Sequence, residues 1–115
     1  MRIAIVEDEP ITRMDLKCIL EDADYEVVGE GSDGFDAINL CKTRQPDIIL
    51  MDINMPNLNG IAAAKAITKE KLCNCIVFLT AYSDSEFIDE AKKLDVFGYL
   101  LKPFDEKSII PTLEI

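Results

Sequence analysis

The chain has 115 residues, of which 49% are hydrophobic and 30% charged, and its 12 basic and 22 acidic residues give a net charge of −10. This length suits a single domain, and the acidity without a Lys/Arg cluster argues against direct binding of nucleic acid. No apolar run approaches the ~20 residues that a membrane helix needs, and no signal peptide is apparent, so we expect a cytoplasmic protein with no membrane contact.

The first part of the chain alternates between strand and helix patterns. A β-branched run predicts a strand at Arg2–Val6, and apolar residues at helical spacing predict a helix from Pro10 to about Ala23. Tyr25–Glu30 is strand-like and is followed by a helical pattern over Asp33–Arg44. Asp47–Met51 is apolar on both faces, which is typical of a central strand in a parallel sheet.

The alternation continues through the second part. A loop rich in Pro, Asn and Gly leads into an alanine-rich helix at Ile61–Lys69, and Cys75–Leu79 is the next apolar strand. The sequence Ser83-Asp84-Ser85-Glu86 has the form of a capping box and opens a helix to about Lys93. Phe97–Leu101 is the fifth predicted strand.

The last predicted helix is short. It is capped by Asp105 and contains Pro111 about six residues later, where proline should kink it. The sequence ends at Ile115, barely three turns into this helix. We therefore expect residues 1–115 to form one domain whose last helix is truncated, and the sequence leaves open whether an output domain follows in the full gene product.

Five strand–helix units in succession predict an α/β fold in which a doubly wound, five-stranded parallel sheet carries helices on both faces. In such sheets, ligands bind outside the carboxyl ends of the strands. Apolar residues recur at helical spacing in the first two predicted helices. They comprise Ile11, Met14, Cys18 and Ile19, and Phe35, Ile38 and Cys41.

The four cysteines, Cys18, Cys41, Cys73 and Cys75, are predicted to be structural. Cys18 and Cys41 lie in helical patterns, where a free cysteine behaves as a small hydrophobe. The pair Cys73-Asn74-Cys75 lacks the two-residue spacing of common zinc motifs, and the chain has no histidine to complete such a site.

Chemically useful residues follow four of the predicted strands. Glu7-Asp8, Asp52, Thr80 and Lys102 stand at these ends, and parallel strands bring such ends to one edge of the sheet. Three carboxylates crowded together repel one another, and Mg²⁺ relieves this because carboxylate oxygens are its preferred protein ligands. The formal charges of the three carboxylates, Lys102 and Mg²⁺ sum to about zero, so a phosphoryl donor can approach.

The nucleophile of such a site is predicted to be a carboxylate. No Ser, Cys or His follows a strand in position to attack, whereas carboxylates do form aspartyl-phosphates. Asp52 is the best candidate because it ends the most apolar and most central strand. Lys102 would pair with one phosphoryl oxygen and the Thr80 hydroxyl with another.

With these residues, the whole chain resembles a response-regulator receiver domain of two-component signalling (CheY-like). The resemblance rests on Glu7-Asp8 after IAIV, Asp52 within LMDINMPNLNG, Thr80-Ala81, and Lys102-Pro103 preceded by Tyr99. It implies a flavodoxin-like strand order, 2-1-3-4-5. It also implies that the domain is no enzyme for other substrates and catalyses only its own phosphorylation and autodephosphorylation.

The resemblance implies a task for each site residue. Asp52 would accept a phosphoryl group from a sensor histidine kinase or phosphotransfer protein. Mg²⁺ would be held by Asp8, Asp52 and the backbone carbonyl of Asn54, and by Glu7 largely through water; Glu at position 7 replaces the commoner Asp of this family.

The same resemblance assigns phosphate binding and switching. Thr80, Ala81 and Lys102 would contact the phosphoryl group, with a cis peptide bond before Pro103 aiming Lys102 into the site. Thr80 would pass the signal to Tyr99, which turns inward on activation, and homodimerisation is possible in the activated state.

Several alternatives stay open. A haloacid-dehalogenase-type phosphatase also uses an Asp nucleophile with Mg²⁺, but it needs a second Asp where this chain has Asn54. Tyr82 and Asn54 are candidates to gate attacking water. The phrases LTAYSD and IIPTLEI resemble receivers that precede an RNA-binding antitermination module, and a stand-alone phosphorelay shuttle is equally compatible with the sequence.

Overall fold

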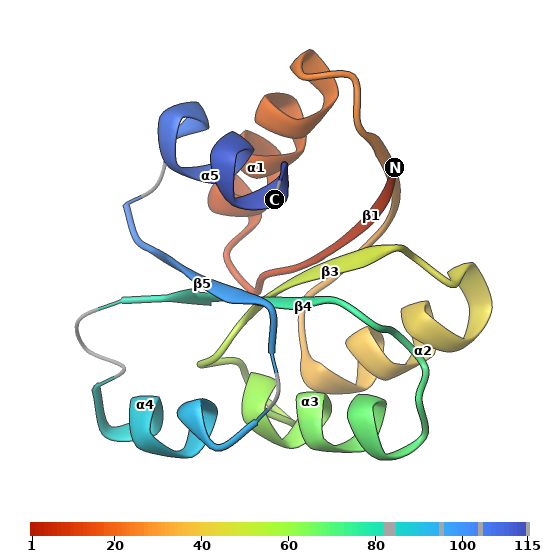
Figure 1. Ribbon diagram of the computed structural model, residues 1–115, viewed down its shortest axis with the longest axis vertical. Helices are drawn as coiled ribbons and strands as arrows, with labels where there is room; N and C mark the ends of the chain where they lie inside the picture. The colour runs from red at the N-terminus through yellow and green to blue at the C-terminus, as the bar shows by residue number, and fades with distance from the viewer. Residues whose placement is uncertain (82–84, 95, 104, 115) are drawn as a thin grey trace.

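Five parallel strands form one sheet in the computed structural model shown in Figure 1, which describes residues 1–81, 85–94, 96–103 and 105–114. Their order, β2-β1-β3-β4-β5, confirms the predicted doubly wound topology. The strands are β1 (Arg2–Val6), β2 (Glu26–Gly31), β3 (Ile48–Asp52), β4 (Ile76–Thr80) and β5 (Gly98–Leu101). The helices are α1 (Pro10–Asp22), α2 (Gly34–Arg44), α3 (Gly60–Lys69), α4 (Ser85–Lys92) and α5 (Glu106–Leu113).

Helices cover both faces of the sheet. Figure 1 shows α1 and α5 on one face and α2, α3 and α4 on the other. Successive strand side chains alternate between these faces, so the core divides into two clusters. Ile49, Met51 and Phe78 pack toward α2 and α3, whereas Leu50 and Leu79 pack toward α1 and α5. Every residue of β3 and β4 is buried, as the continuous apolar runs predicted.

Local sequence signals account for where several helices begin. Pro10 stands in the first turn of α1, where its missing N–H costs nothing. The side chains of Asp33 and Asn59 accept hydrogen bonds from the backbone at the starts of α2 and α3. Asp105 and Ser108 form a capping box that opens α5, which confirms the predicted cap.

The structure describes α5 around Pro111 but only part of the predicted start of α4. Helix α5 contains Pro111 and continues through it to Leu113. The capping box predicted at Ser83-Asp84-Ser85-Glu86 lies mostly outside the described residues, as does Tyr82, and α4 begins at Ser85.

The apolar residues at helical spacing in α1 mostly lie outside its buried face, although Ile19 packs against the core. Ile11 and Met14 are 80% and 65% exposed, and Cys18 is also exposed. The helix rests on the sheet through Leu16 and Leu20, which are fully buried. An outward stripe at helical spacing has the same periodicity as an inward one, so sequence spacing alone does not distinguish the two.

Helix α2 likewise has one exposed residue among those at helical spacing. Phe35 is 59% exposed, while Ala37 and Cys41 face the core. Cys41 is therefore the small buried hydrophobe that was expected, whereas Cys18 is not. No helix among the described residues is long and apolar enough to cross a membrane.

Gly60 allows α3 to begin directly against the end of β3. Its N–H donates to the carbonyl of Ile53 (2.8 Å), and a Cβ at this position would collide with the carbonyl oxygen of Asp52 and lie 3.0 Å from the Cα of Ile53. Both obstructing atoms belong to the backbone, which cannot rotate away as a side chain can.

We predict that Gly60→Ala lowers the free energy of unfolding by about 1–3 kcal/mol, because the added methyl must displace the β3–α3 backbone. Gly98→Ala is the matched control, since its Cβ would meet only Thr112 Cγ2 at 3.7 Å, an ordinary contact. Urea denaturation of both variants measures the difference. Equal stability of the two variants would contradict the steric argument.

Candidate functional site

The carboxyl ends of four strands place the predicted site residues on one edge of the sheet. In the strand register Val6 pairs with Met51, Asp52 with Leu79, and Thr80 with Leu101. Glu7 and Lys102 follow β1 and β5 directly, and the N–H of Lys102 donates to the carbonyl of Thr80 (2.7 Å). The alternation of strands and helices thus brings together residues from distant parts of the sequence.

Three carboxylates form the centre of this edge. Glu7, Asp8 and Asp52 each offer an oxygen, and these oxygens lie within 4.8 Å of one another. Glu7 is fully buried and Asp52 is 4% exposed, whereas Asp8 is exposed to solvent. The cluster therefore has an open side through Asp8 and a closed side formed by the two buried acids.

Lys102 connects the two buried acids. Its Nζ lies 2.7 Å from Glu7 Oε1 and 3.0 Å from Asp52 Oδ2. Burial favours the neutral amine, but the hydrogen bonds to the two carboxylates outweigh it and raise the pKa of Lys102. The Lys102–Pro103 bond is cis, which confirms the expectation for this position.

Lys102 does not satisfy Glu7 completely. Burial, and then the neighbouring Asp52, raise the pKa of Glu7 from 4.5 to about 8, although Lys102 pulls it in the opposite direction. Its Oε2 is buried without a hydrogen-bond partner when the group is ionised. A proton on Glu7 would let it donate to Asp52, which reconciles the raised pKa with the unpaired oxygen.

These observations fit a divalent cation at the site. An unpaired buried carboxylate oxygen, a second buried carboxylate and an exposed third one make a hard-oxygen donor set of the kind that Mg²⁺ prefers. Asn54 lies beside it, since its N–H donates to Asp52 Oδ1 at 3.2 Å. The metal-binding roles of Glu7, Asp8, Asp52 and the Asn54 carbonyl remain predictions.

The predicted switch residues occupy β4 and β5. Thr80 is 5% exposed, and its hydroxyl donates to the carbonyl of Ala81, 3.3 Å away. Tyr99 is 39% exposed, and its ring packs in a tilted arrangement on Phe78, with the ring centroids 6.0 Å apart. The Tyr99 side chain is thus partly exposed and lies beside the core cluster to which Phe78 belongs.

Sequence reasoning missed Arg13 of α1. Its Nη1 donates to the carbonyl oxygen of Glu7 at 2.7 Å, and its Nε lies 3.5 Å from a carboxylate oxygen of Glu30. Arg13 therefore holds the backbone at the end of β1, where the acidic pair begins. The sequence shows only a basic residue six positions after Glu7. Whether this residue reaches the Glu7 carbonyl depends on how α1 packs.

The family model for the response regulator receiver domain matches residues 3–114. The chain belongs to the response-regulator receiver family. It is thus a receiver domain of two-component signalling, as the motifs around Asp52 and Lys102 predicted.

Curated relatives share this domain. The transcriptional regulatory protein PdtaR of Mycobacterium tuberculosis is 40% identical over 114 residues, which are 99% of this chain and 55% of that protein. The chemotaxis protein CheY of Thermotoga maritima is 38% identical over 112 residues, 97% of this chain and 93% of CheY. The receiver domain thus spans about half the length of PdtaR and nearly all of CheY.

Solved structures show the same fold. The receiver domain of the response regulator NarL of M. tuberculosis has a TM-score of 0.90 at 27% identity, covering 98% of this chain and 92% of that one. CheY4 of Vibrio cholerae has a TM-score of 0.88 at 30% identity, covering 98% and 95%. The receiver domain of the sensor histidine kinase PA1611 of Pseudomonas aeruginosa (TM-score 0.87, 26% identity, covering 98% and 93%) carries a magnesium ion in its active-site cleft.

We predict a pH-dependent loss of stability that originates at Glu7. Because its folded-state pKa lies near 8 and its usual value is 4.5, the folded receiver holds a proton that the unfolded chain has released between these values. This contribution is complete below about pH 4.5 and is lost as the pH rises through 8, with a slope of at most about 1.4 kcal/mol per pH unit.

Urea denaturation in EDTA across this pH range tests the prediction. Glu7→Gln, which cannot ionise, should lose the downward slope, whereas the exposed Glu26→Gln should keep it. A Glu7→Gln variant with the same pH dependence as the parent receiver would show that another group is responsible.

Proposed function

We propose that Asp52 accepts a phosphoryl group from the phosphohistidine of a sensor histidine kinase or phosphotransfer protein. The observation that carries this is the position of its carboxylate: at the end of the fully buried β3, 3.0 Å from Lys102 and within the acidic cluster. A carboxylate oxygen attacks phosphorus, the P–N bond of the donor breaks, and an aspartyl-phosphate results.

Mg²⁺ is the proposed cofactor, held by Asp8, Asp52, the Asn54 backbone carbonyl and Glu7. When bound, it supplies positive charge that offsets the acids and the incoming phosphoryl oxygens. The magnesium ion in the PA1611 receiver supports this choice, as does the unpaired oxygen of Glu7. Asp8 is the exposed member of the set and therefore the first protein ligand that an entering ion would meet.

Lys102, Thr80 and Ala81 are the proposed binders of the phosphoryl oxygens. Lys102 already contacts Asp52, so its ammonium is positioned beside the oxygen that would carry the new group. The Thr80 hydroxyl, which now donates to its neighbour's carbonyl, would turn to a phosphoryl oxygen because a charged acceptor makes the stronger hydrogen bond.

The receiver is proposed to act only on itself, through phosphorylation and autodephosphorylation. A haloacid-dehalogenase-type phosphatase needs an acidic group two residues after its nucleophile, where this chain has the amide Asn54. An amide cannot serve as a general acid at neutral pH. The family match to receivers favours the signalling function.

Activation is proposed to change the surface around α4 and β5. Phosphorylation replaces a carboxylate with a group of about two negative charges and three strong acceptors, which draws Thr80 toward it. Tyr99 then turns from its half-exposed position toward the space beside Thr80. The two rotamer states form a local switch whose equilibrium phosphorylation shifts.

Two outputs are proposed for the switch, each supported by one relative. PdtaR, by name a transcriptional regulatory protein, is about twice the length of this receiver, so control of an attached output domain is one proposal, with transcription or RNA-binding antitermination as the process. CheY of T. maritima is nearly coextensive with it, which favours a stand-alone signal carrier or phosphorelay shuttle as the second. In either form, homodimerisation on activation would use the switched surface, and the acidic domain would not itself bind nucleic acid.

We predict that Asp52→Asn abolishes labelling by acetyl phosphate in Mg²⁺, because the amide that replaces the carboxylate is not nucleophilic. Phosphate-affinity gel electrophoresis or intact mass spectrometry measures the labelling. Asp22→Asn, at an exposed position of α1, should label like the parent, and EDTA should prevent labelling of both. Undiminished labelling of Asp52→Asn would rule out the assignment.

We also predict that phosphorylation moves Tyr99 inward only when the Thr80 hydroxyl is present. With fluorotyrosine incorporated, the ¹⁹F resonance of Tyr99 should shift on addition of acetyl phosphate and Mg²⁺, and Tyr99→Phe assigns it. Thr80→Ser should keep the shift and Thr80→Ala should lose most of it, although Asp52 is still phosphorylated. An equal shift in Thr80→Ala would show that Tyr99 moves independently of the Thr80 hydroxyl.

A further inference from the structure

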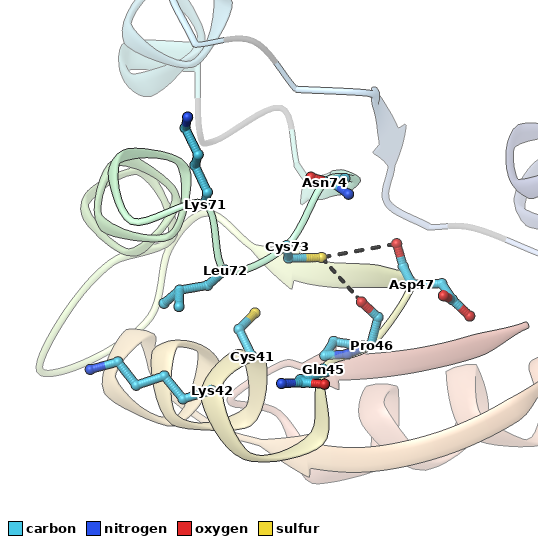
Figure 2. Close-up of a pocket in the computed structure, with 9 residues that line it drawn as sticks. All are labelled: Cys41, Lys42, Gln45, Pro46, Asp47, Lys71, Leu72, Cys73 and Asn74. Carbon is cyan, nitrogen blue, oxygen red and sulfur yellow. Dashed lines mark hydrogen bonds between the residues drawn. The ribbon is translucent and has the colours of Figure 1, made fainter.

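A pocket lies at the opposite end of the sheet from the acidic cluster. Figure 2 shows it between the last turn of α2 and the loop that joins α3 to β4, and its volume is about 500 Å³. Asp47 and Asn74, which line it, precede β3 and β4, so the pocket faces the amino ends of the strands. The phosphoryl-accepting edge, at the carboxyl ends, makes no use of it.

Two thiols meet in this pocket. Cys41 projects from α2 and is 1% exposed, while Cys73 comes from the facing loop and is partly buried. Figure 2 shows the two side chains next to each other; both line the pocket, and Cys73 packs against the core cluster that contains Cys41. Cys73 Sγ also lies 3.5 Å from the carbonyl oxygens of Pro46 and Cys75 and 3.9 Å from that of Asp47, any one of which can accept its single hydrogen when the thiol is protonated.

Cys75, although closer in sequence to Cys73, faces the other way. Cys73 packs against the core cluster that contains Cys41, whereas Cys75 packs against the cluster on the α1 and α5 face. In an extended segment, residues two positions apart point to the same face. Cys73 and Cys75 do not, because the chain bends at Asn74 between them. Cys41 is therefore the partner that the fold gives to Cys73.

We propose that Cys41 and Cys73 are a reversible redox couple that closes to a disulfide when a hydroperoxide oxidises Cys73. The proposal does not depend on the phosphoryl-transfer function. Its ligand class is a small peroxide, which the open pocket admits to Cys73, and its resolving group is the buried thiol of Cys41.

The chemistry balances with the peroxide as the only oxidant. The Cys73 sulfur attacks one peroxide oxygen, the O–O bond breaks, and Cys73 becomes a sulfenic acid while the other oxygen leaves as water or alcohol. The Cys41 sulfur then attacks the Cys73 sulfur, the S–S bond forms, and the sulfenic oxygen leaves as water. The protein loses two hydrogens, and a dithiol returns them.

The electrostatics give the two sulfurs different tasks. The hydrogen bond from Cys41 lowers the pKa of Cys73 to about 7, although burial and the charge of Asp47 oppose it. The same hydrogen bond and burial raise the pKa of Cys41. Cys73 is thus the attacking thiol and Cys41 the one that resolves the sulfenic acid.

Oxidation of the purified, reduced chain with hydrogen peroxide tests the proposal. After free thiols are blocked with N-ethylmaleimide, intact mass and non-reducing peptide mapping should show a monomer that lacks two hydrogens and joins Cys41 to Cys73. Dithiothreitol should restore both free thiols. Replacing the exposed Cys18 by Ala should leave the yield of this product unchanged, since Cys18 lies outside the pocket.

Two variants assign the roles. Cys73→Ser should reduce the intramolecular disulfide to background. Cys41→Ala, which keeps an apolar side chain in the core, should leave Cys73 as a sulfenic acid that dimedone traps; circular dichroism checks that both variants are folded. Free Cys41 and Cys73 after peroxide treatment of the parent chain, or a Cys73–Cys75 bridge in their place, would overturn the proposal.

Discussion

The contact of Lys102 with two buried carboxylates is the constraint on which the site depends. Glu7 and Asp52 would repel each other in a buried place, and a single ammonium within 3.0 Å of both holds them together without neutralising them fully. The remaining imbalance appears as the raised pKa of Glu7 and its unpaired oxygen. The receiver therefore keeps an unsatisfied carboxylate that a cation or a proton would complete, which suits the proposed metal-assisted phosphoryl transfer.

This arrangement follows from the parallel sheet. A succession of parallel strands joined by helices brings residues as distant in sequence as Glu7 and Lys102 to one edge. The same succession buries β3 and β4 on both faces, so the end of β3 is a rigid support for Asp52. Gly60 then lets α3 start against that end, so that the backbone around Asp52 is fixed from both sides.

Alternating patterns and strand-end residues were sufficient to predict the sheet, its two layers of helices and the meeting of Glu7, Asp52 and Lys102. They failed where the outcome depends on how a helix rests on the sheet. Ile11 and Met14 have the right spacing for a buried face but point outward. The contact of Arg13 with the Glu7 carbonyl and the proximity of Cys41 to Cys73 are likewise properties of helix placement, which sequence spacing does not encode.

The separation of the two sites along the strands has a consequence for how signals combine. The acidic cluster lies beyond the carboxyl ends of β3 and β4 and the thiol pocket beyond their amino ends, so strands of five residues, about 17 Å, stand between them. Under the two proposals, phosphorylation at one end and disulfide formation at the other would be separate chemical events on one receiver. A downstream partner that senses both ends would then respond to the coincidence of two stimuli.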